Sequence, residues 1–244
     1  MKLGLAALAL ASIFTTPAIG AADIDAGRTK SLACQACHGS NGMGTAPDIP
    51  NLAGQHAAYL QAQLTAFRAG ARKNDFMNAI AKQLSDSEIE NLAAFWSSLP
   101  AGGPATADPA AEFRKSRMNF PANFPKDFVM YAEHKGDDGK VASRSYVTRP
   151  AIAAARAGTA LPNDTAIVVE NYKDGAVASY AAMGSHAGWG EGIPDLLRNG
   201  DWSYALFDEK KARRDFNYAR CLACHKPKAE TSYVFGYADL AKAQ

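Results

Sequence analysis

The sequence has little net charge, few cysteines and no long hydrophobic run after its first 20 or so residues. A formal net charge of +2 over 244 residues is too small to argue for binding to nucleic acid or to a membrane surface. A membrane-spanning helix needs about 20 apolar residues, and no later stretch is long and apolar enough to form one. The hydrophobic fraction of 48% and charged fraction of 20% instead predict a packed globular protein.

The N-terminal segment is typical of an export signal. Lys2 supplies a positive charge, an apolar run follows from Leu3 to Phe14, and small residues at Gly20 to Ala22 form a cleavage site. The run is short for the alternative, a retained membrane anchor. We therefore expect residues 1–22 to be a cleaved signal peptide, no stable membrane span after cleavage, and a periplasmic mature protein.

The four cysteines form two pairs with one pattern, Cys-x-x-Cys-His. They are Cys34, Cys37 and His38 near the start, and Cys221, Cys224 and His225 near the end. This pattern is typical of c-type haem attachment. The two thiols lie about one helical turn apart and can bond the two vinyl groups of one porphyrin, and the next histidine can ligate its iron.

Three other uses of these cysteines fit the sequence less well. Two disulfides or one four-thiolate zinc site would leave the histidine after each pair unexplained. A thioredoxin-like redox pair needs a βαβ context that the sequence lacks. The sequence therefore predicts two covalently attached haem c groups.

Residues 23–100 carry a helical pattern with the first haem motif near their start. We expect helices over Ala26–Cys34 with Asp25 as N-cap, from Gly54–His56 to Gly70, and from a capping box at Ser85 and Glu88 to Pro100. The stretch Arg72–Met77 reads as a polar loop that ends in a methionine.

Three helices around one haem in about 80 residues resemble a class I cytochrome c, an all-α fold. The Gly-x-Gly-x-x-Pro run Gly42–Pro47 and Met77 before the last helix look most like cytochrome c4 and c5-type carriers. The resemblance implies His38 and Met77 as axial ligands, and a thioether ligand raises the potential.

Met77 has one alternative role and two rivals, Met43 and His56, as the second ligand of the first iron. Met77 could be core filler, as methionine usually is. Met43 lies too close to His38 to reach the opposite haem face, and His56 sits at a helix start, where a surface or propionate contact is more typical.

Residues 101–110 read as a Pro/Gly/Ala-rich linker, and residues 111–244 as a second domain that is no repeat of the first. We expect short helices at Glu112–Met118 and Pro150–Ala157, a hairpin of Phe128–Ala132 and Ser143–Thr148, and strands at Thr165–Glu170, Ala176–Ala182 and Trp202–Phe207. This pattern predicts an α+β domain with a mostly antiparallel sheet.

That domain resembles the cytochrome P-460 family and the related cytochromes c′-beta. The resemblance rests on Phe128–Tyr131, Thr165–Glu170, Ala187–Gly190, Gly200–Tyr204, Cys221–Lys226 and Tyr233–Phe235, in that order. It implies a sheet-bound haem with His225 proximal and an open distal face, and it allows a homodimer. Such relatives either oxidise hydroxylamine, with a haem cross-linked to lysine, or bind nitric oxide and other small gases.

The sequence lacks the lysine that the catalytic relatives use. That residue should fall near Ala154–Leu161, yet no lysine lies between Lys140 and Lys173. The absence favours a c′-beta-like haem over a cross-linked, hydroxylamine-oxidising one.

Several side chains could approach the second iron from its distal side. Met130 reads as a strand residue, His134 as exposed beside a turn, and Met183 and His186 as the two serious ligands. Glu170 and Glu191 could move protons, although solvated or structural roles are more typical of such residues.

Three functional hypotheses follow. In the first, the second haem reacts with or binds a small nitrogen oxide and the first exchanges electrons with periplasmic electron-transfer proteins, which would make the protein a haem oxidoreductase. In the second, both irons are closed and the protein is purely a two-haem carrier. In the third, the protein binds or senses nitric oxide without turnover.

Overall fold

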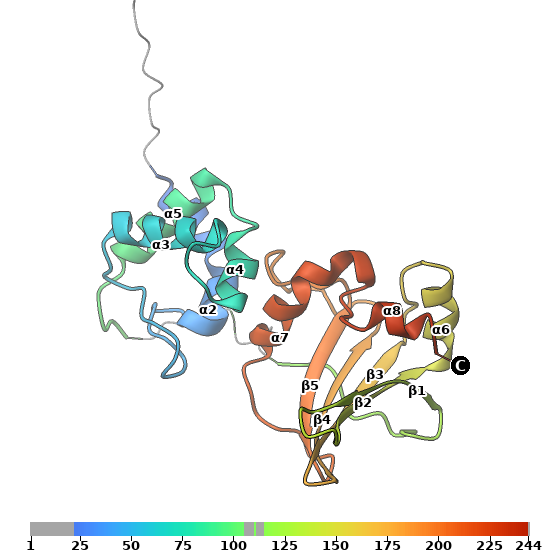
Figure 1. The fold of residues 1–244 in the computed structure, drawn as a ribbon. Coiled ribbons are helices and arrows are strands. Elements are labelled where there is room, and N and C mark those ends of the chain that lie inside the picture. The colour runs from blue at the N-terminus through green and yellow to red at the C-terminus, as the bar shows by residue number, and fades with distance from the viewer. Residues whose placement is uncertain (1–21, 105–109, 111–114, 244) are drawn as a thin grey trace, which may run out of the picture.

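The computed structural model describes residues 22–104, 110 and 115–243, and it shows a helical domain beside a domain built on a sheet (Figure 1). The predicted signal peptide, except for residue 22, lies outside the described residues, as do residues 105–109 of the predicted linker. Of the predicted helix Glu112–Met118, residues 112–114 lie outside them and residues 115–118 are not helical. Within the described residues, no helix is long and apolar enough to cross a membrane.

The first domain consists of helices. They are α1 (Ile24–Lys30), α2 (Leu32–His38), α3 (Ala57–Arg68), α4 (Asp75–Ala81) and α5 (Asp86–Ser98). The expected helix Ala26–Cys34 with Asp25 as N-cap is wrong, because Asp23 caps α1 and the chain breaks at Ser31 before α2. The expected polar loop also ends early, since Asn74 caps α4 and places Met77 within this helix.

Two local features hold the first domain together. The predicted capping box at the start of α5 is present, with Ser85 and Glu88 each bonding to the backbone of the other. Helices α1 and α5 cross at Gly27, where a Cβ atom would come within 2.1 Å of the Asn91 carbonyl oxygen. Glycine is therefore required for this close approach.

The second domain is an antiparallel meander. Its strands are β1 (Phe128–Lys135), β2 (Val141–Thr148), β3 (Ala166–Lys173), β4 (Ala176–Ser185) and β5 (Trp202–Asp208), hydrogen-bonded in chain order. Helix α6 (Arg149–Arg156) follows β2, and α7 (Tyr218–His225), η2 (Lys226–Thr231) and α8 (Tyr237–Leu240) follow β5. The predicted hairpin, strands and Pro150–Ala157 helix are confirmed to within a few residues.

The two faces of the sheet carry different layers. Aromatic side chains from the segment before β1 cover one face, which we call the outer face; among them Phe120 and Phe124 pack with Tyr180. Helices α6, α7 and α8 lie over the other, which we call the helix face (Figure 1). Side chains alternate along each strand, so strand residues can be assigned to one face, except at the register shifts in the β1–β2 and β3–β4 pairs.

The domains meet where α4 faces α7 (Figure 1). Buried apolar residues of both domains belong to one continuous cluster, which includes Ala36 and Leu92 from the first domain and Leu222 from the second. The helix that carries the second Cys-x-x-Cys-His motif therefore lies against the first domain.

Candidate haem sites

The first motif forms α2, with its histidine at the helix end. Gly39 follows in the left-handed region, at φ 77°, and turns the chain away from the helix. The imidazole Nδ1 of His38 lies 2.8 Å from the Pro50 carbonyl oxygen and donates a hydrogen bond to it. The other nitrogen, Nε2, then carries no proton and is free to ligate a metal. Burial lowers the pKa of His38 and favours the neutral ring that a metal ligand requires.

Helix α4 positions Met77 in the same domain. The Asn74 side chain caps the helix by accepting from the Met77 amide at 3.0 Å. The Asn78 side chain donates to the carbonyl oxygens of Phe67 and Arg72, which ties α4 to the end of α3. Met77 is half-buried, and the rival His56 is exposed at the N-cap position of α3.

The second motif forms α7, and a strained turn orients its histidine. Nδ1 of His225 lies 2.6 Å from the Tyr233 carbonyl oxygen, which again leaves Nε2 free. Ser232 and Tyr233 both adopt positive φ, 53° and 61°. Two consecutive non-glycine residues in this region are strained, as is common at functional sites. Burial lowers the pKa of His225, so this ring too is neutral at pH 7.

Aromatic rings flank His225. The Tyr204 ring centre lies 4.4 Å from that of the imidazole, and the Phe235 ring centre 4.9 Å away in an edge arrangement. Phe235 is nevertheless 58% exposed. A large apolar ring left open beside a histidine with a free Nε2 fits a site that a porphyrin would cover.

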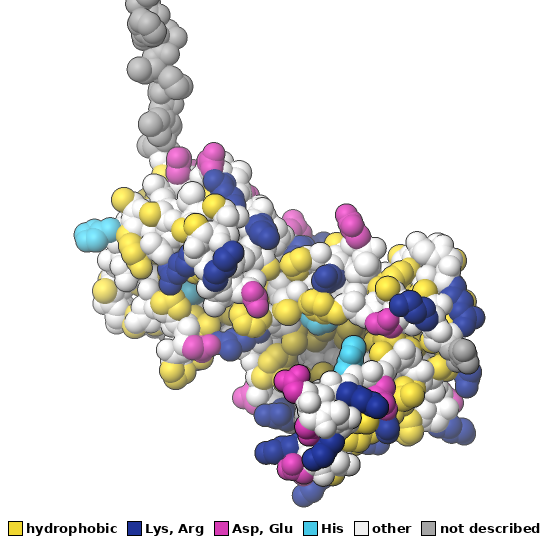
Figure 2. Space-filling view, viewed as in Figure 1, with side chains coloured by type: hydrophobic (Ala, Val, Ile, Leu, Met, Phe, Trp, Pro, Cys, Tyr) yellow, Lys and Arg dark blue, Asp and Glu magenta, His cyan; other side chains and the backbone are white. Residues whose placement is uncertain are grey.

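The helix face of the sheet also has an uncovered strip. Val169, Ala181 and Leu206 face each other in register across β3, β4 and β5. All three are only half-buried, whereas their neighbours on the same face, Ile167, Met183 and Tyr204, are at most 7% exposed. Figure 2 shows a hollow between the helices and the sheet of this domain, bordered largely by hydrophobic side chains. This apolar strip fits a haem lying on the sheet.

The four possible distal ligands of the second iron lie in different parts of the second domain. Met183 belongs to the buried core, and Met130 pairs with Tyr146 on the outer face. His186 is exposed and lies 2.5 Å from Asp164. His134 is exposed, as predicted, but it pairs with Ser143 on the helix face, where Asn171 and Ser179 continue a polar row beside the apolar strip.

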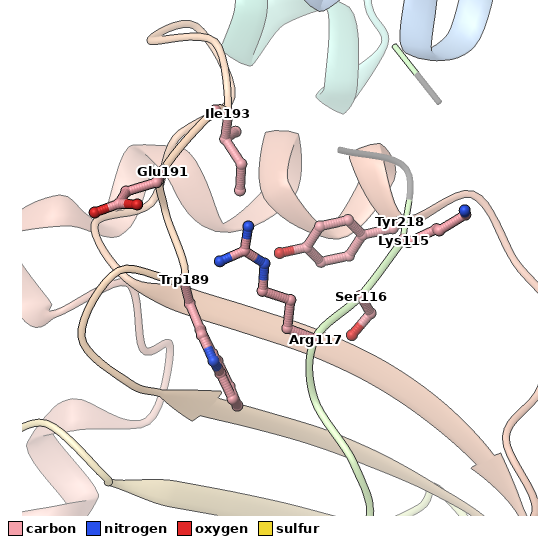
Figure 3. A pocket seen from close by; sticks show the side chains of 8 residues that line it. Lys115, Ser116, Arg117, Trp189, Glu191, Ile193 and Tyr218 are labelled. Atoms are coloured by element: carbon pink, nitrogen blue, oxygen red, sulfur yellow. The ribbon is translucent and has the colours of Figure 1, made fainter. Parts of the chain in front are cut away.

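The two carboxylates considered for proton transfer lie elsewhere. Glu170 is on the outer face and accepts from Tyr146 and Tyr172 at 3.0 and 2.8 Å. Glu191 lines a cavity of about 200 Å³ with Arg117 and Tyr218. In Figure 3 the Arg117 side chain and the Tyr218 hydroxyl approach each other, whereas Glu191 points away. Neither carboxylate lies on the helix face of the sheet.

The rival uses of the cysteines find no support in the site chemistry. Burial raises the pKa of the Cys34 and Cys221 thiols to about 12, whereas zinc binding and thiol exchange both need thiolates. In the described part of the chain, no three His, Cys, Asp or Glu side chains come together as a metal site. At the predicted position of a cross-linking lysine, Arg156 donates to the Ala243 carbonyl.

Sequence reasoning missed the groups around the two histidines. The Pro50 and Tyr233 carbonyls are backbone atoms, which no motif encodes. Tyr204 is distant in sequence from His225, although both lie in segments used for the family resemblance.

Two family models match the chain. Residues 24–100 match Cytochrome c and residues 121–236 match Cytochrome P460. These matches confirm the predicted fold classes, and both families imply covalently bound haem c, as the paired motifs predicted.

Relatives of the first domain include cytochrome c-554(548) of Halomonas halodenitrificans, 46% identical over 81 residues, which are 32% of this chain and 98% of that protein. Cytochrome c4 of Azotobacter vinelandii is 41% identical over 105 residues, 35% of this chain and 50% of that protein. A solved cytochrome c4 of Acidithiobacillus ferrooxidans has 38% identity and a TM-score of 0.31, with 34% of this chain and 53% of that chain covered. The chain thus spans about half the length of these cytochromes c4.

Proposed function

The chain belongs to the cytochrome c family through residues 24–100 and joins this domain to a cytochrome P460 domain at residues 121–236, and from this premise we propose that it is an exported two-haem electron-transfer protein with one closed and one open iron. The closed site relays electrons. The open site binds or reacts with a small nitrogen oxide, nitric oxide rather than hydroxylamine. When bound, each haem supplies an iron that cycles between two oxidation states, and an open iron also takes a small ligand.

The first site relies on α2 and α4. Cys34 and Cys37 would attach the haem, and His38 and Met77 would ligate its iron. The Pro50 carbonyl fixes the tautomer and the orientation of the His38 ring. Asn74 and Asn78 hold α4 so that Met77 keeps one position. Two fixed ligands require little rearrangement on electron exchange, which suits a carrier.

The second site relies on α7 and the helix face of the sheet. Cys221 and Cys224 would attach the haem and His225 would ligate its iron, with the ring oriented by the Tyr233 carbonyl. The observation that carries the proposal is the apolar strip Val169, Ala181 and Leu206, which offers no ligating atom. Apolar walls favour neutral diatomic ligands over charged ones.

We assign residues 1–22 to a signal peptide, 23–100 and 111–244 to the two haem domains, and 101–110 to the linker. The mature protein is then periplasmic, and its partners are other electron-transfer proteins of that compartment. Nitric oxide binding without turnover is the alternative to a reaction at the open site, and turnover assays distinguish the two.

Carbon monoxide titration of the dithionite-reduced protein tests the open site. We expect the Soret band of one haem of two to shift, and the same result in His134→Ala. If wild type binds no CO, the open site is wrong and the protein is a closed carrier; CO binding by His134→Ala alone would then identify His134 as the closing ligand.

Turnover assays with nitric oxide and hydroxylamine follow for a CO-binding protein. Consumption of nitric oxide with matching oxidation or reduction of the haems supports a reaction, and binding alone supports a nitric oxide module. Mass spectrometry of haem-bearing peptides should find two thioether bonds per haem and no lysine link. A lysine cross-link would contradict the preference for nitric oxide.

A further inference from the structure

The two haem-attachment helices are joined directly by one side chain, Asn217. Its amide nitrogen donates to the Ala36 carbonyl at 3.1 Å and lies 3.6 Å from the Cys37 sulfur. Both acceptors belong to α2. In the haem-bearing protein the Cys37 sulfur is a thioether, which remains a weak acceptor.

The other end of the same amide belongs to α7. The Asn217 oxygen accepts from the Ala219 amide at 3.1 Å and caps this helix. Cys221 lies four residues further on. One planar amide therefore bonds to both helices. A path from Cys37 to Cys221 consists of the hydrogen bond from the Asn217 amide to the Cys37 sulfur and the covalent chain from Asn217 to Cys221.

A second bridge lies beside the first. Arg220, which precedes Cys221, contacts Asp48 at 2.5 Å, and its guanidinium lies 5.8 Å from the Phe76 ring centre. Asp48 is two residues from Pro50, whose carbonyl orients His38, and Phe76 precedes Met77. Arg220 thus contacts the segment whose carbonyl orients His38 and the helix that carries Met77.

Further contacts join the two domains beside these bridges. The Gln83 side chain donates to the Leu196 carbonyl at 3.1 Å, and Phe216 packs against the common apolar cluster. An incidental contact between domains would involve residues remote from both sites. Here the contacts that Asn217 and Arg220 make with described residues of the first domain lie within two residues of Cys37, Pro50 or Met77.

We propose that the start of α7, Asn217 to Arg220, couples the two haems, with Asn217 as the positioning residue that sets the path between them. This inference rests on the proposed function in that both sites must carry haem. With both haems bound, one electron would pass along this path, so that one iron is oxidised as the other is reduced, and no proton would move. Neither iron needs to be open for this coupling.

Flash photoreduction of the oxidised, full-length protein by a flavin semiquinone tests the coupling. After the bimolecular reduction of one haem, we expect a second phase whose rate constant does not depend on protein concentration. Asn217→Ser keeps a hydroxyl to cap α7 but is too short to reach α2. It should slow this phase by about tenfold, with the melting temperature and both haem potentials unchanged.

A charge exchange tests the second bridge. Asp48→Lys should slow the same phase, and adding Arg220→Asp should restore it. Arg68→Ala, which removes an ion pair with Asp86 inside the first domain, is the matched control and should have no effect.

Three results would contradict the coupling: no concentration-independent phase in a protein that carries two haems, a wild-type rate in Asn217→Ser, or equal slowing in Arg68→Ala. The CO titration described above reports on the open iron separately. The coupling can therefore fail while the proposed function stands, and the reverse also holds.

Discussion

Backbone carbonyls decide which nitrogen of each motif histidine is free. Pro50 holds Nδ1 of His38 and Tyr233 holds Nδ1 of His225, so both rings present Nε2. The motif predicted the two histidines from sequence. It could not predict the carbonyls, because their positions depend on turns, and at Tyr233 on a turn that ordinary propensities disfavour.

Met77 should set the potential of the first haem. Replacing it with alanine removes the proposed thioether ligand, which favours the reduced iron. We expect the potential to fall by roughly 100 mV or more, within the ~0.8 V range that axial ligands span. Spectroelectrochemical titration measures this, and Met43→Ala is the control. An unchanged potential in Met77→Ala would remove Met77 as a ligand.

Phe235 should be covered in the haem-bearing protein. Its ring is 58% exposed here but lies beside His225, whereas Met130 is 49% exposed on the outer face. Phe235→Ala should therefore cost roughly 1–2 kcal/mol of stability and shift the absorbance of the second haem. Met130→Ala should do neither. Thermal unfolding and Soret spectra measure both effects, and equal behaviour of the two variants would place the haem elsewhere.

At the scale of elements, the pattern along the chain predicted α3, α5, α6 and all five strands found among the described residues, but not α4, α7 or α8. The alternation of apolar residues and the Gly136–Gly139 turn are local signals, so β1 and β2 could be placed from sequence. The break at Ser31 and the start of α4 at Asp75 could not, because caps at Asp23 and Asn74 compete with neighbouring polar residues that fit the same role.

The start of α5 should depend on pH through Glu88. Its carboxylate caps the helix and pairs with Lys30 at 2.5 Å. The hydrogen bond from Lys30, followed by that from the Ser85 amide, lowers its pKa below the ordinary 4.5. A lowered carboxyl pKa means that the ion pair stabilises the fold above pH 4.5, and that this stability is lost as the pH falls through the folded value.

Glu88→Gln isolates that contribution. Glutamine can still cap the helix but cannot pair with Lys30 as an ion. At pH 7 the variant should lose roughly 0.5 kcal/mol in the free energy of unfolding, the size expected for a partly exposed pair, and the difference should shrink as the pH falls below 4.5. Urea unfolding followed at the first haem measures it. A difference that does not depend on pH would assign the effect to the cap instead.

At the scale of the whole molecule, sequence predicted two domains but not their contact. The Cys-x-x-Cys-His motifs lie at opposite ends of the chain, and nothing in their spacing indicates that α2 and α7 meet. The contact arises because Asn217 and Arg220 extend from α7 toward the first domain. When a surface side chain bonds to residues of another domain, the sequence around it carries no pattern that identifies them, so only the structure reveals these partners.

This contact should respond to pH through Asp48. A hydrogen bond from Arg220 is the main cause that lowers the pKa of Asp48 below its ordinary 3.8. Because the folded pKa is lowered, the pair holds the domains together above pH 3.8 and is lost as the pH falls through the folded value. Between pH 5 and pH 8 the contact should not change.

Hydrogen–deuterium exchange of the α7 amides measures this contribution when wild type and Asp48→Asn are compared at one pH. At pH 7 the variant should exchange roughly twofold faster in the first turn of α7, as expected for loss of an exposed ion pair, and this difference should shrink as the pH falls below 3.8. Asp86→Asn removes the partner of Arg68 within the first domain and should leave α7 unaffected. Equal exchange of wild type and Asp48→Asn at pH 7 would mean that the Asp48–Arg220 pair contributes nothing to docking, which then rests on the apolar cluster and on the hydrogen bonds of Asn217 and Gln83.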